Sequence, residues 1–252
     1  LWPGPSEDLC WLAGDFRILQ RIDGHRFSLD DLMVAYTAAE ELGTRPPRRY
    51  LDLGCGIGTV LLFLAWRFPE AEALGVEAQE VSAELAGRSI AWNGVGDRVR
   101  VVRGDFREAA PLAGAGPFDL VTGTPPYFPP GTGVESPNVQ RAPCRFEHRG
   151  GIEAYVATAA RVLAPGAPFV VCQAWLERDR VEPAARGNGL VVESRRAIVP
   201  REGKAPLLEI YVMRHAGEAA TPRIDEPLVV RDASGRRTEA FSSVRLAMGM
   251  PP

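Results

Sequence analysis

Two short segments of the chain combine residue types that suit ligand binding and the positioning of a reacting group. The first reads LDLGCGIG at residues 51–58, and the second reads TPPY at residues 124–127. Glycines at alternate positions permit a tight turn and a close approach to a ligand, because no Cβ stands in the way. Two consecutive prolines fix the backbone and lack an N–H, so their segment presents carbonyl oxygens from a stiff platform. The two segments predict a ligand-binding loop with a reaction platform beside it.

The spacing of the glycines separates two classes of nucleoside cofactor. Gly54, Gly56 and Gly58 form a GxGxG pattern with Asp52 ahead of it. Dinucleotide sites use GxGxxG, in which the helix that follows seats a pyrophosphate. S-adenosylmethionine has no pyrophosphate, so the looser spacing suits it better, and Asp52 can help to hold its methionine amino group. The loop therefore predicts S-adenosylmethionine rather than NAD.

Acidic residues after the next two expected strands extend this prediction. Glu77 ends the second strand of the series, where a carboxylate can accept hydrogen bonds from both ribose hydroxyls. Asp105 follows the third strand and can accept a hydrogen bond from an adenine amino group, with Phe106 beside the ring. The predicted cofactor-binding residues are Asp52, Gly54, Cys55, Gly56, Gly58, Glu77, Ala78, Asp105, Phe106 and Thr124.

The platform runs off the end of the fourth expected strand. Ligands of parallel sheets lie beyond the carboxyl ends of the strands, so residues 124–127 should border the cofactor. A proline carbonyl can accept a hydrogen bond from an amine, and Tyr127 offers a face for stacking on a planar group. The predicted catalytic residues are Thr124, Pro125, Pro126 and Tyr127. They indicate direct in-line methyl transfer to nitrogen, which needs positioning more than a strong base.

Strand-like and helix-like stretches alternate around these motifs, which predicts a parallel sheet covered by helices on both faces. The expected strands are residues 50–53, 73–76, 99–102, 118–122 and 169–172, and the expected helices are residues 59–68, 81–92 and 152–163. Residues 190–199 and 207–213 are also strand-like, and the link between them is too short for a parallel crossover. We therefore expect these two strands to pair as an antiparallel hairpin.

This layout resembles the class I methyltransferase fold, a Rossmann-like α/β architecture. The resemblance implies a mainly parallel seven-stranded sheet with a terminal antiparallel hairpin and helices on both faces. The expected division is residues 1–45 as an N-terminal accessory segment, residues 46–215 as the methyltransferase domain and residues 216–252 as a C-terminal extension.

Turn residues predict the local structure of the two terminal segments. In the N-terminal segment, residues 16–20 alternate like a strand, and Asp23-Gly24 suits a hairpin-type turn. A helix is expected after Ser28, which is a common capping residue. In the C-terminal extension, residues 227–245 are expected to form a small hairpin around residues 232–235.

Composition and cysteine spacing narrow the class of protein further. With 252 residues, 46% of them hydrophobic, the chain can bury one sizeable core. No apolar run reaches the ~20 residues that span a bilayer, and the N-terminus shows no secretory pattern. Cys10, Cys55, Cys144 and Cys172 lie far apart, so neither a metal site nor a disulfide framework is expected. These features predict a cytoplasmic protein that uses no metal and no membrane.

Charge is uneven along the chain. Residues 1–135 carry 12 Lys/Arg and 19 Asp/Glu, whereas residues 136–252 carry 17 and 13. A positive C-terminal half suits an anionic partner such as RNA, although a solvated surface gives the same pattern. The long polar segment at residues 128–151 lies next to the platform and contains three arginines. Its position favours a role as a substrate-binding loop.

The platform segment resembles that of amino-methyltransferases with an Asn/Asp/Ser-Pro-Pro-Tyr/Phe motif. Within these, the chain is most similar to the bacterial tRNA adenine-N6 methyltransferases that act on position 37 of a valine tRNA. Residues 20–30 and residues 145–148, RFEH, support this similarity. It implies S-adenosylmethionine as the cofactor, tRNA as the partner and a target adenine that is unstacked into the pocket. The implied substrate-binding residues are Tyr127, Phe128, Arg145 and His148.

Thr124 departs from the family pattern, which has Asn at this position. An Asn carbonyl accepts a hydrogen bond from the target amino group, whereas Thr accepts through a hydroxyl on a shorter, β-branched side chain. Three alternatives therefore stay open: a protein glutamine methyltransferase, a small-molecule N-methyltransferase, and a catalytically silent protein that binds S-adenosylmethionine or RNA. The glutamine enzymes usually carry a separate helical domain, unlike the short segment ahead of the glycine loop here. We favour methylation of an adenine in RNA.

Overall fold

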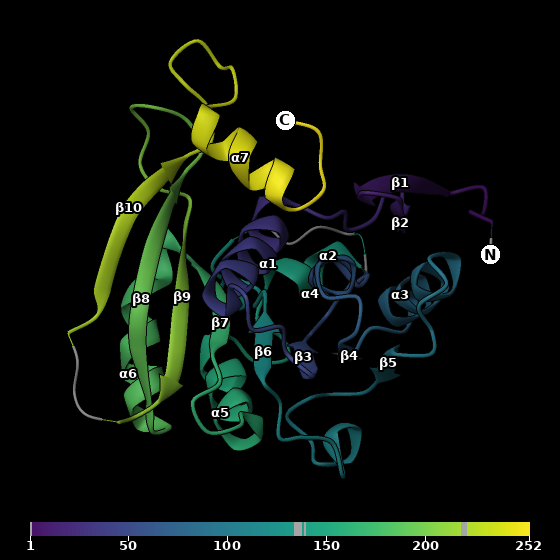
Figure 1. The fold of residues 1–252 in the computed structure, drawn as a ribbon, viewed down its shortest axis with the longest axis horizontal. Helices are drawn as coiled ribbons and strands as arrows, with labels where there is room; N and C mark the ends of the chain where they lie inside the picture. Colours follow the sequence, from purple (N-terminus) through teal and green to yellow (C-terminus); the bar gives the residue numbers. More distant parts are fainter. Residues whose placement is uncertain (1, 134–137, 139, 218–220) are drawn as a thin grey trace.

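An eight-stranded sheet forms the centre of the protein in the computed structural model, which describes residues 2–133, 138, 140–217 and 221–252. Its strands are β3 (Arg49–Leu53), β4 (Glu72–Glu77), β5 (Val99–Arg103), β6 (Leu120–Gly123), β7 (Phe169–Ala174), β8 (Leu190–Val199), β9 (Leu208–His215) and β10 (Arg223–Val229). From one edge to the other the order is β10-β8-β9-β7-β6-β3-β4-β5 (Figure 1). The strand that leads into the glycine loop, β3, therefore lies inside the sheet with a neighbour on each side.

The strands of this sheet run parallel except for β9. β3 pairs in parallel with β4 and β6, and β9 lies antiparallel between β7 and β8. The mainly parallel α/β fold and the antiparallel pairing of residues 190–199 with 207–213 are thus confirmed. The expected count of seven strands is corrected to eight, because β10 adds in parallel to the free edge of β8.

Helices cover both faces of the sheet, and the buried side chains form one hydrophobic cluster on each face. The helices are α1 (Leu29–Leu42), α2 (Thr59–Arg67), α3 (Glu80–Trp92), α4 (Arg141–Arg145), α5 (Ile152–Val162), α6 (Val181–Gly187) and α7 (Glu239–Ala247), with short 3₁₀ turns at Ala110–Leu112 and Trp175–Arg180. Buried residues of α1, α2, α3 and α7 belong to one cluster. Those of α5 and α6 belong to the other, as Figure 1 also suggests by their position below the first group.

The N-terminal segment contributes a hairpin and the first helix to the same face of the sheet. β1 (Glu7–Ala13) pairs antiparallel with β2 (Phe16–Arg21), and Leu12 and Ile18 are buried in the cluster that α1 and α2 share. The hairpin turns at Gly14, which has φ 52, instead of at the expected Asp23-Gly24. Only glycine adopts that conformation without strain, so Gly14 is the residue that sets the turn.

Residues 227–245 do not form the expected small hairpin. The turn around residues 232–235 is present, but it links the edge strand β10 to the helix α7 and is flanked by a single antiparallel bridge, Arg231 to Arg237. Thr238 caps α7 by accepting a hydrogen bond from the Phe241 N–H at 3.1 Å, and Phe241 is buried. The helix forms because its apolar side chains are spaced for one face and bury against the main core.

None of the helices in the described part of the chain is long and apolar enough to cross a membrane. All four cysteines have free thiols.

Candidate active site

A cleft with an empty volume of about 860 Å³ opens at the carboxyl ends of β3, β4, β5 and β6. Ten of the residues predicted from the sequence line it: Gly54, Cys55, Gly56, Glu77, Ala78, Asp105, Phe106, Thr124, Pro125 and Pro126. Six predicted residues do not line it: Asp52, Gly58, Tyr127, Phe128, Arg145 and His148. The structure thus brings the glycine loop and the Pro-Pro segment to one cavity, and it places the expected substrate-binding side chains outside that cavity.

The glycine loop turns through conformations that glycine alone adopts readily. Gly54, Gly56 and Gly58 have φ values of 59, 55 and 88. A Cβ on Gly54 would lie 2.2 Å from the Tyr155 hydroxyl, whereas a Cβ on Gly56 would meet no atom within 4 Å. The loop is therefore packed tightly against Tyr155 on one side and open toward the cavity at Gly56, as a ligand cradle requires.

Glu77 is held at the cavity wall by two backbone amides. Its Oε2 accepts a hydrogen bond from the Gly56 N–H at 2.9 Å, and its Oε1 accepts one from the Gln79 N–H at 2.6 Å. Burial raises the pKa of Glu77, while these backbone hydrogen bonds act in the opposite direction. Each carboxylate oxygen keeps a lone pair for a ligand, so a cis-diol such as that of a ribose fits this position.

One end of the cleft is lined by the acidic residue Asp105 and by the aromatic rings of Phe106 and Tyr155. Phe106 packs edge-on against Tyr155, with ring centroids 4.5 Å apart, and this pair forms one wall. Asp105 pairs with the Arg107 guanidinium at 2.5 Å, and hydrogen bonding to Arg107 lowers the pKa of Asp105. A ring wall beside an ionised carboxylate fits a flat base that carries an amino group, such as adenine. The side chains that line the cleft therefore fit S-adenosylmethionine.

Asp52 lies beneath the glycine loop and faces the helices α1 and α2. Its Oδ1 accepts a hydrogen bond from the Thr122 hydroxyl at 2.8 Å, and its Oδ2 is buried without a hydrogen-bond partner among the described residues. Burial raises the pKa of Asp52 to about 7, against the hydrogen bond from Thr122. The role of Asp52 in cofactor binding stays a prediction, since its side chain does not line the cleft in this structure.

The platform segment is fastened at its C-terminal end. The Tyr127 hydroxyl donates a hydrogen bond to Asp30 Oδ2 at 2.6 Å, which turns this side chain away from the cleft and toward α1. The backbone N–H groups of Tyr127 and Phe128 both donate to the Arg145 carbonyl, at 3.1 and 3.0 Å. Thr124, Pro125 and Pro126, which precede these contacts in the chain, line the cavity wall. Stacking of Tyr127 on a substrate thus stays a prediction that needs a change in this side chain.

Residues from the N-terminal segment and from α5 complete the cavity, and sequence reasoning missed their role. Asp30 and Asp31 begin α1, His25 precedes them, and Tyr155 comes from α5. Burial lowers the pKa of His25, which favours the neutral imidazole. A run of two acids at a helix start was visible in the sequence, but it is indistinguishable from ordinary helix capping without the fold.

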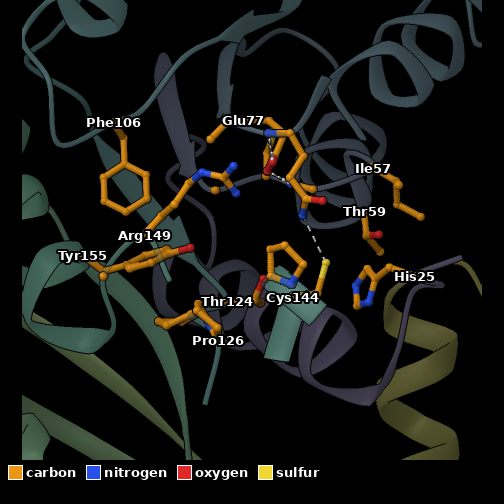
Figure 2. Close-up of a pocket in the computed structure, with 18 of the residues that line it drawn as sticks. His25, Ile57, Thr59, Glu77, Phe106, Thr124, Pro126, Cys144, Arg149 and Tyr155 are labelled. Carbon is orange, nitrogen blue, oxygen red and sulfur yellow. Dashed lines mark hydrogen bonds between the residues drawn. The ribbon is translucent and has the colours of Figure 1, made fainter. Parts of the chain in front are cut away.

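The segment that follows the platform folds back over the cleft, although residues 134–137 and 139 lie outside the described part of the chain. Cys144 accepts a hydrogen bond from the Gln79 side chain at 3.5 Å. Figure 2 shows Arg149 reaching across the cavity toward Glu77, with Tyr155 and Phe106 on one side and His25 and Cys144 on the other. The segment is anchored outside the cleft by Arg180, which binds both carboxylate oxygens of Glu147 at 2.8 and 2.9 Å.

A second hollow adjoins this cleft and is lined by basic side chains. Arg26, Arg141 and Arg145 surround it together with Gly24 and His25, and His25 also lines the main cleft. The Arg145 guanidinium lies 6.0 Å from the ring centre of Phe128, and the tilted rings of His148 and Phe146 have centroids 6.3 Å apart. The predicted substrate-binding residues are therefore grouped beside the cleft and not within it.

Fold and cleft together define a class I S-adenosylmethionine-dependent methyltransferase, and comparison with known proteins agrees. A family model described as "Methyltransferase domain" matches residues 51–130. The chain is 30% identical over 199 residues to a tRNA1(Val) (adenine(37)-N6)-methyltransferase of Bacteroides thetaiotaomicron, covering 78% of this chain and 80% of that one. The chain belongs to the family of class I methyltransferases that includes this enzyme, which confirms the resemblance inferred from the motifs.

The chain is also similar to proteins with other stated activities. A 4-amino-L-phenylalanine/4-methylamino-L-phenylalanine methyltransferase of Streptomyces pristinaespiralis is 35% identical over 164 residues, which cover 57% of this chain and 54% of that one. The chain spans about half the length of several of the curated relatives it matches. Among solved structures, a predicted O-methyltransferase from Agrobacterium tumefaciens superposes with a TM-score of 0.64 at 19% identity, covering 88% of this chain and 98% of that one. That likeness supports the fold alone.

Replacing Glu77 by Gln should weaken cofactor binding about tenfold. The amide has one acceptor oxygen in place of two, so it cannot keep both backbone hydrogen bonds and also hold a ribose diol, and one hydrogen bond to a charged group is worth about 1.5–3 kcal/mol. Calorimetric titration with S-adenosylhomocysteine measures this. Glu84→Gln, on an exposed face of α3, is the control and should leave the affinity unchanged. Equal affinity of Glu77→Gln and wild type would exclude Glu77 from the cofactor site.

Replacing Asp52 by Asn should stabilise the cofactor-free protein more at pH 8 than at pH 5. The folded carboxyl has a pKa of about 7 against an ordinary value of 3.8, so the folded state holds a proton that the unfolded state has released between these values. The free energy of unfolding therefore falls as pH rises through this window, and the penalty is complete above pH 7. Thermal unfolding at both pH values measures the effect, with the exposed Asp179→Asn as control. A gain that does not depend on pH would contradict the raised pKa.

Proposed function

We propose that this protein transfers a methyl group from S-adenosylmethionine to the exocyclic N6 amine of an adenine in RNA, with tRNA as the substrate class. The observation that carries the proposal is the junction of two cavities. The cleft with the cofactor-type residues ends at Thr124, Pro125 and Pro126, and His25 joins it to the arginine-lined hollow. An amine at the platform and a phosphate in the hollow then belong to one nucleic-acid ligand.

The chain's own contribution to the chemistry is positioning. S-adenosylmethionine supplies an activated methyl group, so the protein needs to hold the amine nitrogen in line with it and to exclude water. The Pro125 and Pro126 backbone is rigid, and Pro125 is buried. A hydrogen bond from the amine N–H to an acceptor on this segment orients the nitrogen lone pair toward the methyl group. No strong base is required, because the amine becomes acidic only as the new bond forms.

Charge supports an anionic ligand at the hollow. Arg145 makes no ion pair among the described residues, and its guanidinium lies over Phe128. Arg141 donates from Nε to the Gly24 carbonyl at 2.9 Å, so the rest of its guanidinium is available to a ligand. Arg26 pairs with Asp8 at 2.9 Å, which holds it in place at the rim. Arginines fixed in this way suit phosphate, which they bind through paired N–H donors.

A small aromatic amine is the second candidate acceptor. The relative that methylates 4-amino-L-phenylalanine supports it, since an arylamine presents the same planar N–H₂ group as adenine N6. The carboxyl groups of Asp30 and Asp31 also line the cleft, and both fit a cationic or amine-bearing small molecule. This candidate makes no use of the arginine-lined hollow, and that difference separates the two acceptors.

The test is methyl transfer from labelled S-adenosylmethionine to parallel acceptors: total tRNA, a protein extract, 4-amino-L-phenylalanine and buffer. Label that elutes as N6-methyladenosine after nucleoside digestion supports the proposal. Label in the amino acid supports the second candidate, and label in protein supports glutamine methylation. Cofactor binding without transfer to any acceptor would contradict both candidates and favour a silent binding protein.

Replacing Arg145 by Gln should weaken tRNA binding without weakening cofactor binding. Loss of one phosphate contact should reduce the slope of log affinity against log salt by about one unit. Fluorescence anisotropy of labelled tRNA over a salt series measures this, and calorimetry with S-adenosylhomocysteine checks the cofactor site. Arg186→Gln on α6 is the control, because this side chain is 68% exposed and lies on the other face of the sheet. An unchanged slope for Arg145→Gln would remove the hollow from the RNA-binding surface.

A further inference from the structure

A short backbone ladder holds the C-terminal end of the Pro-Pro platform. The Tyr127 and Phe128 N–H groups both donate to the Arg145 carbonyl, at 3.1 and 3.0 Å. In return, the Glu147 N–H donates to the Phe128 carbonyl at 2.9 Å. The two prolines ahead of this ladder have no N–H, so they add no amide hydrogen bond that could hold the platform in its place. The position of the platform therefore depends on residues 145–147.

Residues 145–147 carry two side chains that are nearly closed off from solvent. Phe146 is 3% exposed, and its ring centroid lies 6.3 Å from that of Phe128. This ring contact joins the two halves of the ladder to each other. The Glu147 side chain is 8% exposed, and it binds to a different part of the fold. Glu147 is therefore the side chain that ties the ladder to the body of the protein.

One guanidinium holds the Glu147 carboxylate end-on. Arg180 Nη1 donates to Oε1 at 2.8 Å, and Arg180 Nη2 donates to Oε2 at 2.9 Å. A Cβ on Gly151 would lie 2.3 Å from the same carboxyl group, so the carboxylate packs against the N-cap of α5. The positive end of this helix favours an anion there. Two parallel donors fix both the distance and the direction of the carboxylate, and we call this Arg180–Glu147 pair the clamp.

Arg180 belongs to the part of the fold that carries the platform strand. It ends the 3₁₀ turn that follows β7, and β7 pairs directly with β6, the strand that leads into the platform. The turn is fixed at both ends, because the Trp175 N–H donates to the Leu207 carbonyl at 3.1 Å and Val181 is fully buried. The clamp thus connects the ladder to the strand that neighbours the platform.

Arg180 also pairs with two other carboxylates, neither of which lies on the ladder. It donates to Glu153 at 2.7 and 2.9 Å and to Glu177 at 3.5 Å. The Glu153 side chain is 52% exposed, against 8% for Glu147. Water can replace Arg180 at Glu153, whereas Glu147 without Arg180 would be a buried charge with no cation beside it. The two glutamates therefore separate a solvated ion pair from a buried one on the same guanidinium.

The stretch that the clamp holds reaches both parts of the proposed substrate site. Arg145 lines the arginine-lined hollow, and Arg149 reaches into the main cleft (Figure 2). Glu147 lies between them on one continuous piece of backbone. A displacement of Glu147 would therefore move the platform and both arginines together.

We propose that Arg180 is a positioning residue for methyl transfer: through Glu147 it holds residues 145–147 in place, and these hold the Pro-Pro platform at the cofactor cleft. Arg180 itself does not line the cleft. Its loss should leave the glycine loop and Glu77 intact while the platform shifts away from its working position. The turnover test below rests on the proposed N-methyl transfer, whereas the exchange test does not.

Hydrogen exchange at the platform tests the clamp without any acceptor. The two prolines carry no amide hydrogen, so a peptide that covers residues 124–128 reports mainly on the two amides that donate to the ladder. Its exchange should become at least about tenfold faster in Glu147→Gln and Arg180→Gln, and stay within about twofold of wild type in Glu153→Gln. A glutamine at 147 keeps one acceptor oxygen but turns an N–H₂ group toward the guanidinium. Peptides from β3 should exchange as in wild type.

The exchange test has outcomes that do not depend on the substrate. Unchanged exchange in Glu147→Gln, or an equal acceleration in Glu153→Gln, would overturn the proposal whatever the acceptor. Glu147→Gln leaves Arg180 paired with Glu153, so it decides the test by itself if Arg180→Gln does not fold. Faster exchange in Glu147→Gln of a protein that does not methylate RNA would support the clamp and reject the proposed substrate.

A double-mutant cycle on turnover tests the consequence for catalysis. Arg180→Gln and Glu147→Gln should each lower kcat at least about tenfold, while the Kd for S-adenosylhomocysteine stays within about threefold of wild type. The double variant should lose no more than the larger single loss, because both changes remove the same clamp. Glu153→Gln is the matched control and should keep kcat within about twofold. Losses that add in the double variant, or a loss in Glu153→Gln equal to that in Glu147→Gln, would overturn the proposal.

Discussion

The register of three parallel strands is the constraint on which the whole cleft depends. Leu53 of β3 stands opposite Val76 of β4 on one side and opposite Gly123 of β6 on the other. The next residue of each strand or loop is therefore Gly54, Glu77 and Thr124 in one row across the sheet. A shift of one residue in either pairing would turn the strands' side chains to the opposite face and separate the glycine loop from the platform. Backbone pairing inside the core thus sets the geometry of the site before any ligand binds.

Close packing around Gly75 and Gly123 leaves no space for larger side chains and stabilises this register. A Cβ on Gly75 would lie 2.7 Å from the Cys55 sulfur and 2.9 Å from Val101. A Cβ on Gly123 would lie 2.6 Å from the Tyr155 ring, the same ring that closes on Gly54. The close approach of α5 therefore requires glycine at the end of β3 and at the end of β6. One tyrosine thus requires glycine both at Gly123 and at Gly54 of the glycine loop, although these two positions lie at very different distances from it along the chain.

These contacts explain what the sequence could and could not predict. Strand-loop-helix patterns located β3, β4, β5 and β6 to within about two residues, and the parallel-sheet rule then placed their loops at one edge. Asp30, Asp31 and Tyr155 were not predicted as wall residues, because their approach to the cleft depends on how α1 and α5 pack on the sheet. The edge strand β10 and the helix α7 were missed for the same reason, since Leu228 and Phe241 are buried only through contacts with distant parts of the chain.

Charge is divided between the two parts of the proposed substrate site. Asp30, Asp31 and Glu77 border the cleft, and Asp52 lies directly beneath it, so its interior favours a positive or hydrogen-donating group. The arginines lie beyond His25, where a polyanion can reach them without entering the acidic cleft. A nucleic acid satisfies both parts at once when a single base leaves the stack and its phosphates stay outside. For the proposed RNA substrate, the basic rim would attract the phosphate backbone and the carboxyl groups would select the amine edge of the base that enters.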